Sequence, residues 1–221
     1  MLPIGDDNST RRTVPVVTYL LIFINVIVFL FELAAGDNFI YRWSFVPSYF
    51  LTNPGVEWIT IFTSMFLHGG WMHLLGNMLY LLIFGDNVED RMGHGRFLLF
   101  YLLCGIAATM AQLITTAYSD LNIPNLGASG AIAGVLASYL ILFPRQRVRV
   151  VIIAWVIPLP SLVVIGIWFL LQVLYQMSSS GDGVAYMAHI GGFLAGLLLT
   201  FVFRKRSLPP RLPYNTTFPQ Q

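Results

Sequence analysis

A serine, two histidines and an asparagine lie within or beside long apolar stretches of this sequence, where polar side chains are energetically costly. Ser129 stands in the run GASG at 127–130, and His189 stands in AHIGG. His73 and Asn77 are four residues apart, so on a helix they share one face. A serine hydroxyl becomes a nucleophile when a base such as imidazole takes its proton. These residue types point to acyl transfer, with His73 and Asn77 as donors to the developing oxyanion.

The composition predicts that these residues belong to a membrane protein. Of the 221 residues, 57% are hydrophobic and 10% are charged, whereas soluble domains carry about 25% charged residues. A spanning helix needs about 20 residues. We therefore expect an all-α membrane protein with six spanning helices, the fourth of them short. The six apolar segments are 14–35, 71–88, 95–117, 129–143, 148–175 and 185–203. The first is too long for the apolar region of a cleavable signal peptide, so we expect it to remain as a helix.

The basic residues indicate the orientation of the chain. Of the 12 lysines and arginines, all but Arg42 fall on the side of the membrane that holds the N-terminus when the segments alternate. By the positive-inside rule that side is the cytoplasm. We therefore expect a multi-pass protein of a prokaryotic plasma membrane, with a domain over 14–203 between a cytoplasmic N-terminus (1–13) and a cytoplasmic, disordered tail (204–221).

The two longer outside loops differ in character. Residues 36–70 are rich in aromatic side chains and are interrupted by prolines, so we expect this loop to lie in the outer interface of the membrane. Residues 176–185 are polar and glycine-rich, and we expect them to be mobile.

Residue counts place the polar side chains at one depth. Ser129 and His189 each lie 15 residues before the end of their segments, at Pro144 and Arg204, which is ~22 Å of helix. His73 lies close to the same level. The fourth helix then begins at Ser129, inside a hydrocarbon layer about 30 Å thick. Non-helical chain at that depth is tolerated where it is buried in protein or lines a wet cavity. Ser129 is therefore expected at the floor of a water-filled pocket.

Pairs of small residues are expected to bring the serine and the histidine together. Gly130 and Gly134 are spaced by four on the fourth segment, as are Gly192 and Gly196 on the sixth. Such pairs let helix backbones approach closely. Each feature alone has an ordinary structural explanation, since glycine pairs usually serve packing and membrane serines often bond to their own backbone. Their combination at one depth favours chemistry.

Together these motifs resemble the rhomboid family of intramembrane serine proteases, over about residues 40–203. GASG at 127–130 resembles the family's nucleophile motif, AHIGGFLAG at 188–196 its sixth-helix motif, and FLHGGWMHLLGNM at 66–78 its second-helix motif. The resemblance implies Ser129 as nucleophile, His189 as general base, and an oxyanion hole of His73, Asn77 and the Ser129 backbone N–H. It implies structural support from His68, Gly127, Gly130, Gly192, Gly196, Glu89 and Arg91.

The family implies cleavage of the transmembrane segments of other membrane proteins near the outer face. A stable helix hides its peptide carbonyls, so substrates need small or helix-breaking residues. Lateral access beside the segment 148–175 and a cap at 176–185 are expected. The partners are such substrates and the lipid bilayer; no nucleic acid, metal or organic cofactor is expected. The alternatives are a catalytically inactive rhomboid-like protein that binds membrane helices, and a transporter or channel that uses the same polar residues as a path for protons or substrate. A transporter would be expected to carry intramembrane carboxylates. Apart from Asp86 at the cytoplasmic end of the second segment, only Glu32 lies in an apolar segment, near an end where we expect it to reach water.

The sequence departs from the family pattern at two positions. Trp58 is followed by Ile59 where many members have arginine. Ala133 stands where some bacterial members have a tyrosine that stacks on the catalytic histidine. No acidic third member is apparent, because Asp182 lies in the polar loop. We therefore predict a Ser–His dyad in which close helix packing orients His189.

Overall fold

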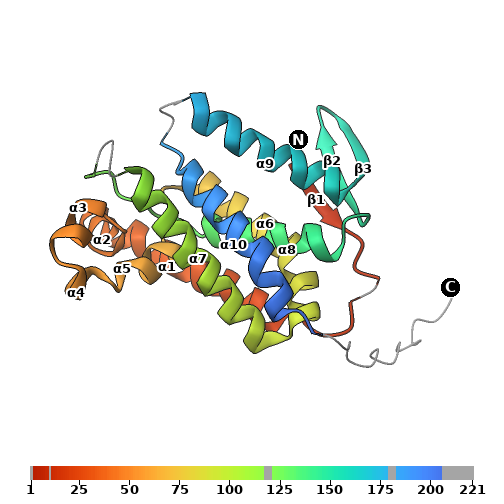
Figure 1. Cartoon of the computed structure of the whole chain (residues 1–221), viewed down its shortest axis with the longest axis horizontal. Helices are drawn as coiled ribbons and strands as arrows, with labels where there is room; N and C mark the ends of the chain where they lie inside the picture. The colour runs from red at the N-terminus through yellow and green to blue at the C-terminus, as the bar shows by residue number, and fades with distance from the viewer. Residues whose placement is uncertain (1, 10, 117–120, 179–182, 206–221) are drawn as a thin grey trace.

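The computed structural model describes residues 2–9, 11–116, 121–178 and 183–205, which are mostly helical, as expected (Figure 1). Within these ranges, six helices of 14 or more residues form a bundle. They are α1 (Val16–Ala35), α6 (Trp71–Met92), α7 (His94–Thr116), α8 (Ser129–Leu142), α9 (Ser161–Ser178) and α10 (Tyr186–Phe203). Residues 206–221 of the predicted tail (204–221) lie outside the described residues, as do residues 179–182 of the polar loop, which include Asp182.

Four of these helices, α1, α7, α9 and α10, are long and apolar enough to cross a membrane. α8 has only 14 residues. α6 is long enough, but its last turns carry Asp86, Glu89 and Asp90. A multi-pass membrane protein is therefore supported, whereas the count of six spans and the orientation of the termini remain predictions.

The short helix α8 lies at the centre of the bundle. All of its residues from Gly130 to Tyr139 are buried, and α6, α7, α9 and α10 pack around it. A Cβ on Gly192 would lie 2.0 Å from the carbonyl oxygen of Gly130, and one on Gly196 would lie 2.4 Å from that of Gly134. The expected packing of the fourth and sixth helices through small residues is therefore present.

The chain between α1 and α6 forms four short helices and one 3-10 turn at one end of the bundle (Figure 1). Phe45 and Asn125 exchange two backbone hydrogen bonds of 3.0 and 2.8 Å, which tie this region to the chain that leads into α8. Its position relative to the membrane interface remains a prediction. The elements are α2 (Asp37–Trp43), α3 (Pro47–Thr52), α4 (Pro54–Glu57), α5 (Thr60–Thr63) and η1 (Ser64–Phe66).

A small three-stranded antiparallel sheet, which was not expected, stands beside the helices of this mostly helical chain. The segment 148–175 was expected to be one helix, but its first part forms the hairpin of β2 (Arg147–Ile152) and β3 (Trp155–Pro160). β1 (Leu2–Asp6), from the N-terminal region expected only as a cytoplasmic extension, pairs with the other edge of β2. The reason is local, because RVRVVI alternates arginine with β-branched valine, which favours a strand. The prolines of β3 lack the N–H that a helix interior needs.

Candidate active site

Ser129 is the first residue of α8, and a glycine makes this helix start possible. Gly127 has a φ of +123°, a conformation that side chains disfavour. A Cβ there would lie 2.8 Å from the His73 ring atoms Cε1 and Nε2. The Gly127 N–H donates to the carbonyl oxygen of Ser64 at 2.8 Å, which anchors the chain just before the helix. Because the first N–H groups of a helix have no intrahelical partner, those at Ser129 are left for a ligand.

His189 of α10 contacts Ser129 directly. Its Nε2 lies 2.8 Å from the Ser129 Oγ, and its Nδ1 lies 2.7 Å from the Oε1 of Gln172 on α9. The Gln172 Nε2 donates to the carbonyl oxygen of Trp168 at 3.2 Å, which fixes the orientation of the amide. Since Oε1 can only accept, the proton of a neutral His189 sits on Nδ1. Nε2 is then free to accept the serine proton.

Gln172 was not singled out from the sequence, and packing alone was expected to orient His189. The structure adds a hydrogen bond and two aromatic neighbours: the Trp168 ring is 5.9 Å from the imidazole centroid and the Tyr186 ring is 6.3 Å away. Gln172 is buried, with 8% of its surface exposed. A glutamine in an otherwise apolar helix indicates, from the sequence alone, a polar group that needs a partner, because burying an amide without one is costly.

His73 and Asn77 of α6 face the same place. The His73 Nδ1 accepts the backbone N–H of Gly69 at 3.3 Å. A neutral His73 therefore carries its proton on Nε2, the ring atom beside Gly127. The Asn77 Nδ2 is buried and has no hydrogen-bond partner among the described residues. The structure thus brings two donor groups to the start of α8.

A cavity of about 930 Å³ connects these groups, which is within the usual range for ligand sites. Ser129, His189, His73 and Asn77 all line it. Its walls come from α6, α7, α8, α9, α10 and the chain at 123–126 and 183–185. No group of three His, Cys, Asp or Glu side chains in the described ranges is placed to hold a metal ion.

His68 and Glu32 form a buried corner behind the cavity. The His68 ring lies edge-on to His73, with centroids 5.1 Å apart, and its backbone N–H donates to the Glu32 carboxylate at 3.1 and 3.2 Å. Glu32 is only 2% exposed, so the expectation that it reaches water is wrong. The chain that enters α6 covers it.

Glu89 and Arg91 lie in the last turns of α6, away from the cavity that begins at its first turns. The buried Glu89 carboxylate accepts the backbone N–H groups of Val17 and Thr18 at 2.9 and 2.7 Å, and so caps α1. The Arg91 guanidinium lies 4.9 Å from the centre of the Phe143 ring.

Asp6 ties the sheet to the same end of the bundle. Its Oδ2 accepts hydrogen bonds from the Tyr139 hydroxyl at 2.5 Å and from the Asn87 amide at 2.8 Å. Burial is the largest influence on this carboxyl group and raises the pKa of Asp6 from 3.8 to about 6. The nearby Asp86 carboxylate acts in the same direction.

Comparison with known proteins shows the family to which the chain is similar. The family profile of the Rhomboid domain matches residues 55–206. The rhomboid YdcA of Bacillus subtilis is 31% identical over 193 residues, which are 86% of this chain and 89% of that protein. Rhomboid protein 1 of Saccharomyces cerevisiae, a mitochondrial protein, is 32% identical over 195 residues, 85% of this chain and 53% of its own length. The rhomboid protease GluP of Bacillus subtilis is 43% identical over 84 residues, 38% of this chain and 16% of its own length. This chain therefore belongs to the rhomboid family.

Proposed function

We propose that this chain is an intramembrane serine endopeptidase that cleaves transmembrane segments of other membrane proteins near the outer face. The observation that carries the proposal is the 2.8 Å contact between the Ser129 Oγ and the His189 Nε2 at the wall of a large cavity. Nucleophile, base and oxyanion donors come from three helices, α8, α10 and α6, and meet at one place.

In the proposed reaction the Ser129 Oγ attacks the carbonyl carbon of the scissile peptide while its proton passes to the His189 Nε2. The His73 Nε2–H, the Asn77 amide and the Ser129 backbone N–H stabilise the oxyanion of the tetrahedral intermediate. The imidazolium then gives the proton to the leaving amine, and an acyl-enzyme remains on Ser129. A water molecule, deprotonated by His189, hydrolyses this ester and restores the serine.

Gln172 acts in this scheme as a positioning residue. Its Oε1 accepts the Nδ1–H of His189 at 2.7 Å, and this bond strengthens when the ring becomes positively charged. It holds the ring in the tautomer that can accept the serine proton. The role is that of the acid in a Ser–His–Asp triad, filled here by a neutral amide.

The substrate class follows from the depth of the site. A peptide bond in a regular helix is hidden from attack, so segments with small or helix-breaking residues are expected to unwind into the cavity. Trp168 and Tyr175 of α9 and Met72 and Tyr80 of α6 line the cavity. We propose that the substrate comes in from the side, past α9.

Labelling with a fluorophosphonate probe tests the proposal, because the probe reacts with an activated serine. The wild-type protein in detergent is expected to be labelled, and Ser129→Ala and His189→Ala are expected not to be. Ser138→Ala is the matched control, since Ser138 is buried on the same helix. Equal labelling of Ser129→Ala would refute the assignment of the nucleophile. No labelling of the wild type, with no cleavage of a reconstituted transmembrane substrate, would favour the inactive helix-binding alternative.

A further inference from the structure

The hairpin of β2 and β3 connects the end of α8 to the start of α9 and has two different faces. Paired residues on neighbouring strands point to the same side of a sheet. One face is formed by the pairs Val148–Leu159, Val150–Ile157 and Ile152–Trp155. The opposite face carries Arg147 and Arg149, paired with Pro160 and Pro158.

The apolar face of the hairpin extends beyond the protein that covers its base. Val148 and Val150 are fully buried in the main core. Toward the turn, the exposed fractions on the same face rise to 39% for Ile157, 36% for Ile152 and 74% for Trp155. Ile152, Ile153, Trp155 and Ile157 together form an exposed apolar surface, the hairpin patch.

The turn residue Ile153 adds a second observation. It is 97% exposed and has a φ of +58°, and it is the one non-glycine residue with a positive φ in the part of the chain that the structure describes. A β-branched side chain is strained in this conformation, which glycine and asparagine adopt readily. In water both the strain and the exposure of this isoleucine are unfavourable. An apolar surrounding removes the second of these costs.

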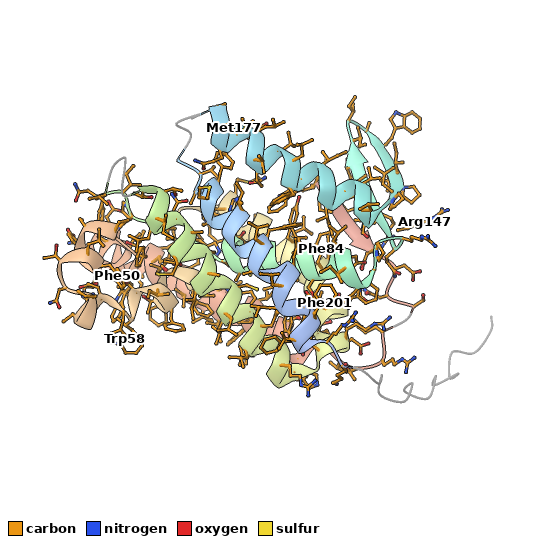
Figure 2. All side chains as sticks on the ribbon, viewed as in Figure 1. Phe50, Trp58, Phe84, Arg147, Met177 and Phe201 are labelled. Atoms are coloured by element: carbon orange, nitrogen blue, oxygen red, sulfur yellow. The ribbon has the colours of Figure 1, made fainter. Side chains whose placement is uncertain are left out.

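The position of the hairpin identifies what surrounds it. β3 runs directly into α9, whose first turn exposes Leu162 and Val163, and α9 is long and apolar enough to span a membrane. Figure 1 shows the hairpin beside the first turns of α9, and Figure 2 shows Met177 at the opposite end of that helix. The hairpin patch therefore continues a lipid-facing helix surface at the boundary of the bilayer.

Positive charges lie next to this apolar surface. Arg145 and Arg147 are exposed at the base of the hairpin, and Figure 2 shows Arg147 at the periphery of the molecule. Tryptophan with neighbouring arginine is typical of segments in the headgroup region, where the ring lies among the lipids and the cation meets phosphate.

We propose that the hairpin patch inserts into the interfacial layer of the bilayer, in the leaflet where α9 begins, and that Arg145 and Arg147 bind the phosphates of anionic lipids there. The hairpin thereby anchors the start of α9 to the membrane surface. This inference concerns the lipid-exposed surface and is independent of the proposed catalysis.

Fluorescence quenching tests the depth of the hairpin. The full chain with Cys104→Ala, which replaces its single, buried cysteine, receives Ile153→Cys and a small environment-sensitive fluorophore, in vesicles of phosphatidylcholine and phosphatidylglycerol. We expect quenching by lipids with a nitroxide near the glycerol end of the acyl chain, and protection from aqueous iodide. Leu162→Cys on α9 is the lipid-facing control, and Ser9→Cys, exposed and polar, is the aqueous control.

Three outcomes would overturn the proposal. An Ile153→Cys label that behaves like the Ser9→Cys label places the hairpin in water. Energy transfer between labels on separate molecules shows that a second copy covers the hairpin patch, when the transfer persists after the protein is diluted with excess lipid. The third outcome concerns the arginines. Their proposed part is refuted when the Ile153→Cys label lies at the same depth with and without phosphatidylglycerol and the double change Arg145→Gln with Arg147→Gln leaves that depth unchanged.

Discussion

Replacing Gln172 by methionine is expected to slow the reaction of Ser129 while the fold is kept. Methionine is unbranched and of similar size, so it fills the same space beside His189 but offers no strong acceptor for Nδ1–H. The contact that is lost is the 2.7 Å hydrogen bond from His189 to the Gln172 Oε1. The imidazole is then free to turn or to adopt the tautomer that cannot accept the serine proton.

The magnitude follows from the charge that develops on His189 in the proposed reaction. Hydrogen bonds to charged groups contribute about 1.5–3 kcal/mol, and each 1.36 kcal/mol corresponds to a factor of about ten in rate. The second-order rate of labelling by a fluorophosphonate is therefore expected to fall roughly 10- to 150-fold. The assay is the time course of labelling in detergent, with the thermal unfolding midpoint measured on the same samples.

Two further variants separate positioning from packing. Gln172→Glu keeps an acceptor oxygen toward Nδ1 and is expected to restore the rate to within about tenfold of the wild type. Gln176→Met changes a second glutamine on the cavity wall one turn away, while both ring nitrogens of His189 keep their partners. A wild-type rate in Gln172→Met, or an equal loss in Gln172→Met and Gln172→Glu, would refute the positioning role.

Two other predictions follow from the packing and from the sheet. In Gly192→Ala the new methyl would lie 2.0 Å from the Gly130 carbonyl oxygen, so α8 and α10 must separate. We expect a loss of about 1–3 kcal/mol in the free energy of unfolding and slower labelling of Ser129, whereas Gly166→Ala, where a Cβ meets nothing within 4 Å, changes neither. Burial raises the pKa of Asp6 from 3.8 to about 6, so the folded protein binds more protons than the unfolded chain between these values. The stability that Asp6 contributes is therefore full below about pH 4 and is lost as the pH rises through about 6, a fall of roughly 3 kcal/mol in the free energy of unfolding. Unfolding followed across this range by circular dichroism should show the slope, and Asp6→Asn should remove it; an unchanged slope in that variant would assign it to other groups.

The helices nearest the site could be predicted from the sequence, because local features define their ends. α8 begins at Ser129, as the residue count from Pro144 required, and α10 covers residues 186–203 of the predicted 185–203. These runs are strongly apolar and are bounded by proline, glycine or arginine. The approach of α8 to α10 was also predictable, since the glycine pairs on both helices allow their backbones to come close.

The sheet was not predictable in the same way, because it depends on contacts between distant parts of the chain. β1 pairs with β2 across more than 140 residues, from Leu2 to Val151. Hydropathy does not distinguish a short apolar strand from the start of a spanning helix. The alternation in RVRVVI and the prolines at 158 and 160 were the local signals against a helix, but they belong to a segment, 148–175, that is apolar overall.

The boundary of α9 also explains why Gln172 was overlooked among the polar residues at one depth. Counted from the predicted start at 148, Gln172 would lie 24 residues along the helix, or ~36 Å, which is beyond a hydrocarbon layer of about 30 Å. Counted from the observed start at Ser161, it lies 11 residues along, or ~17 Å, close to the level of Ser129 and His189. The hairpin occupies the residues that had been assigned to the first turns of the helix. Once they are removed from the count, Gln172 lies at the depth of His189 and becomes a polar group that requires a partner, which the Nδ1 of His189 supplies.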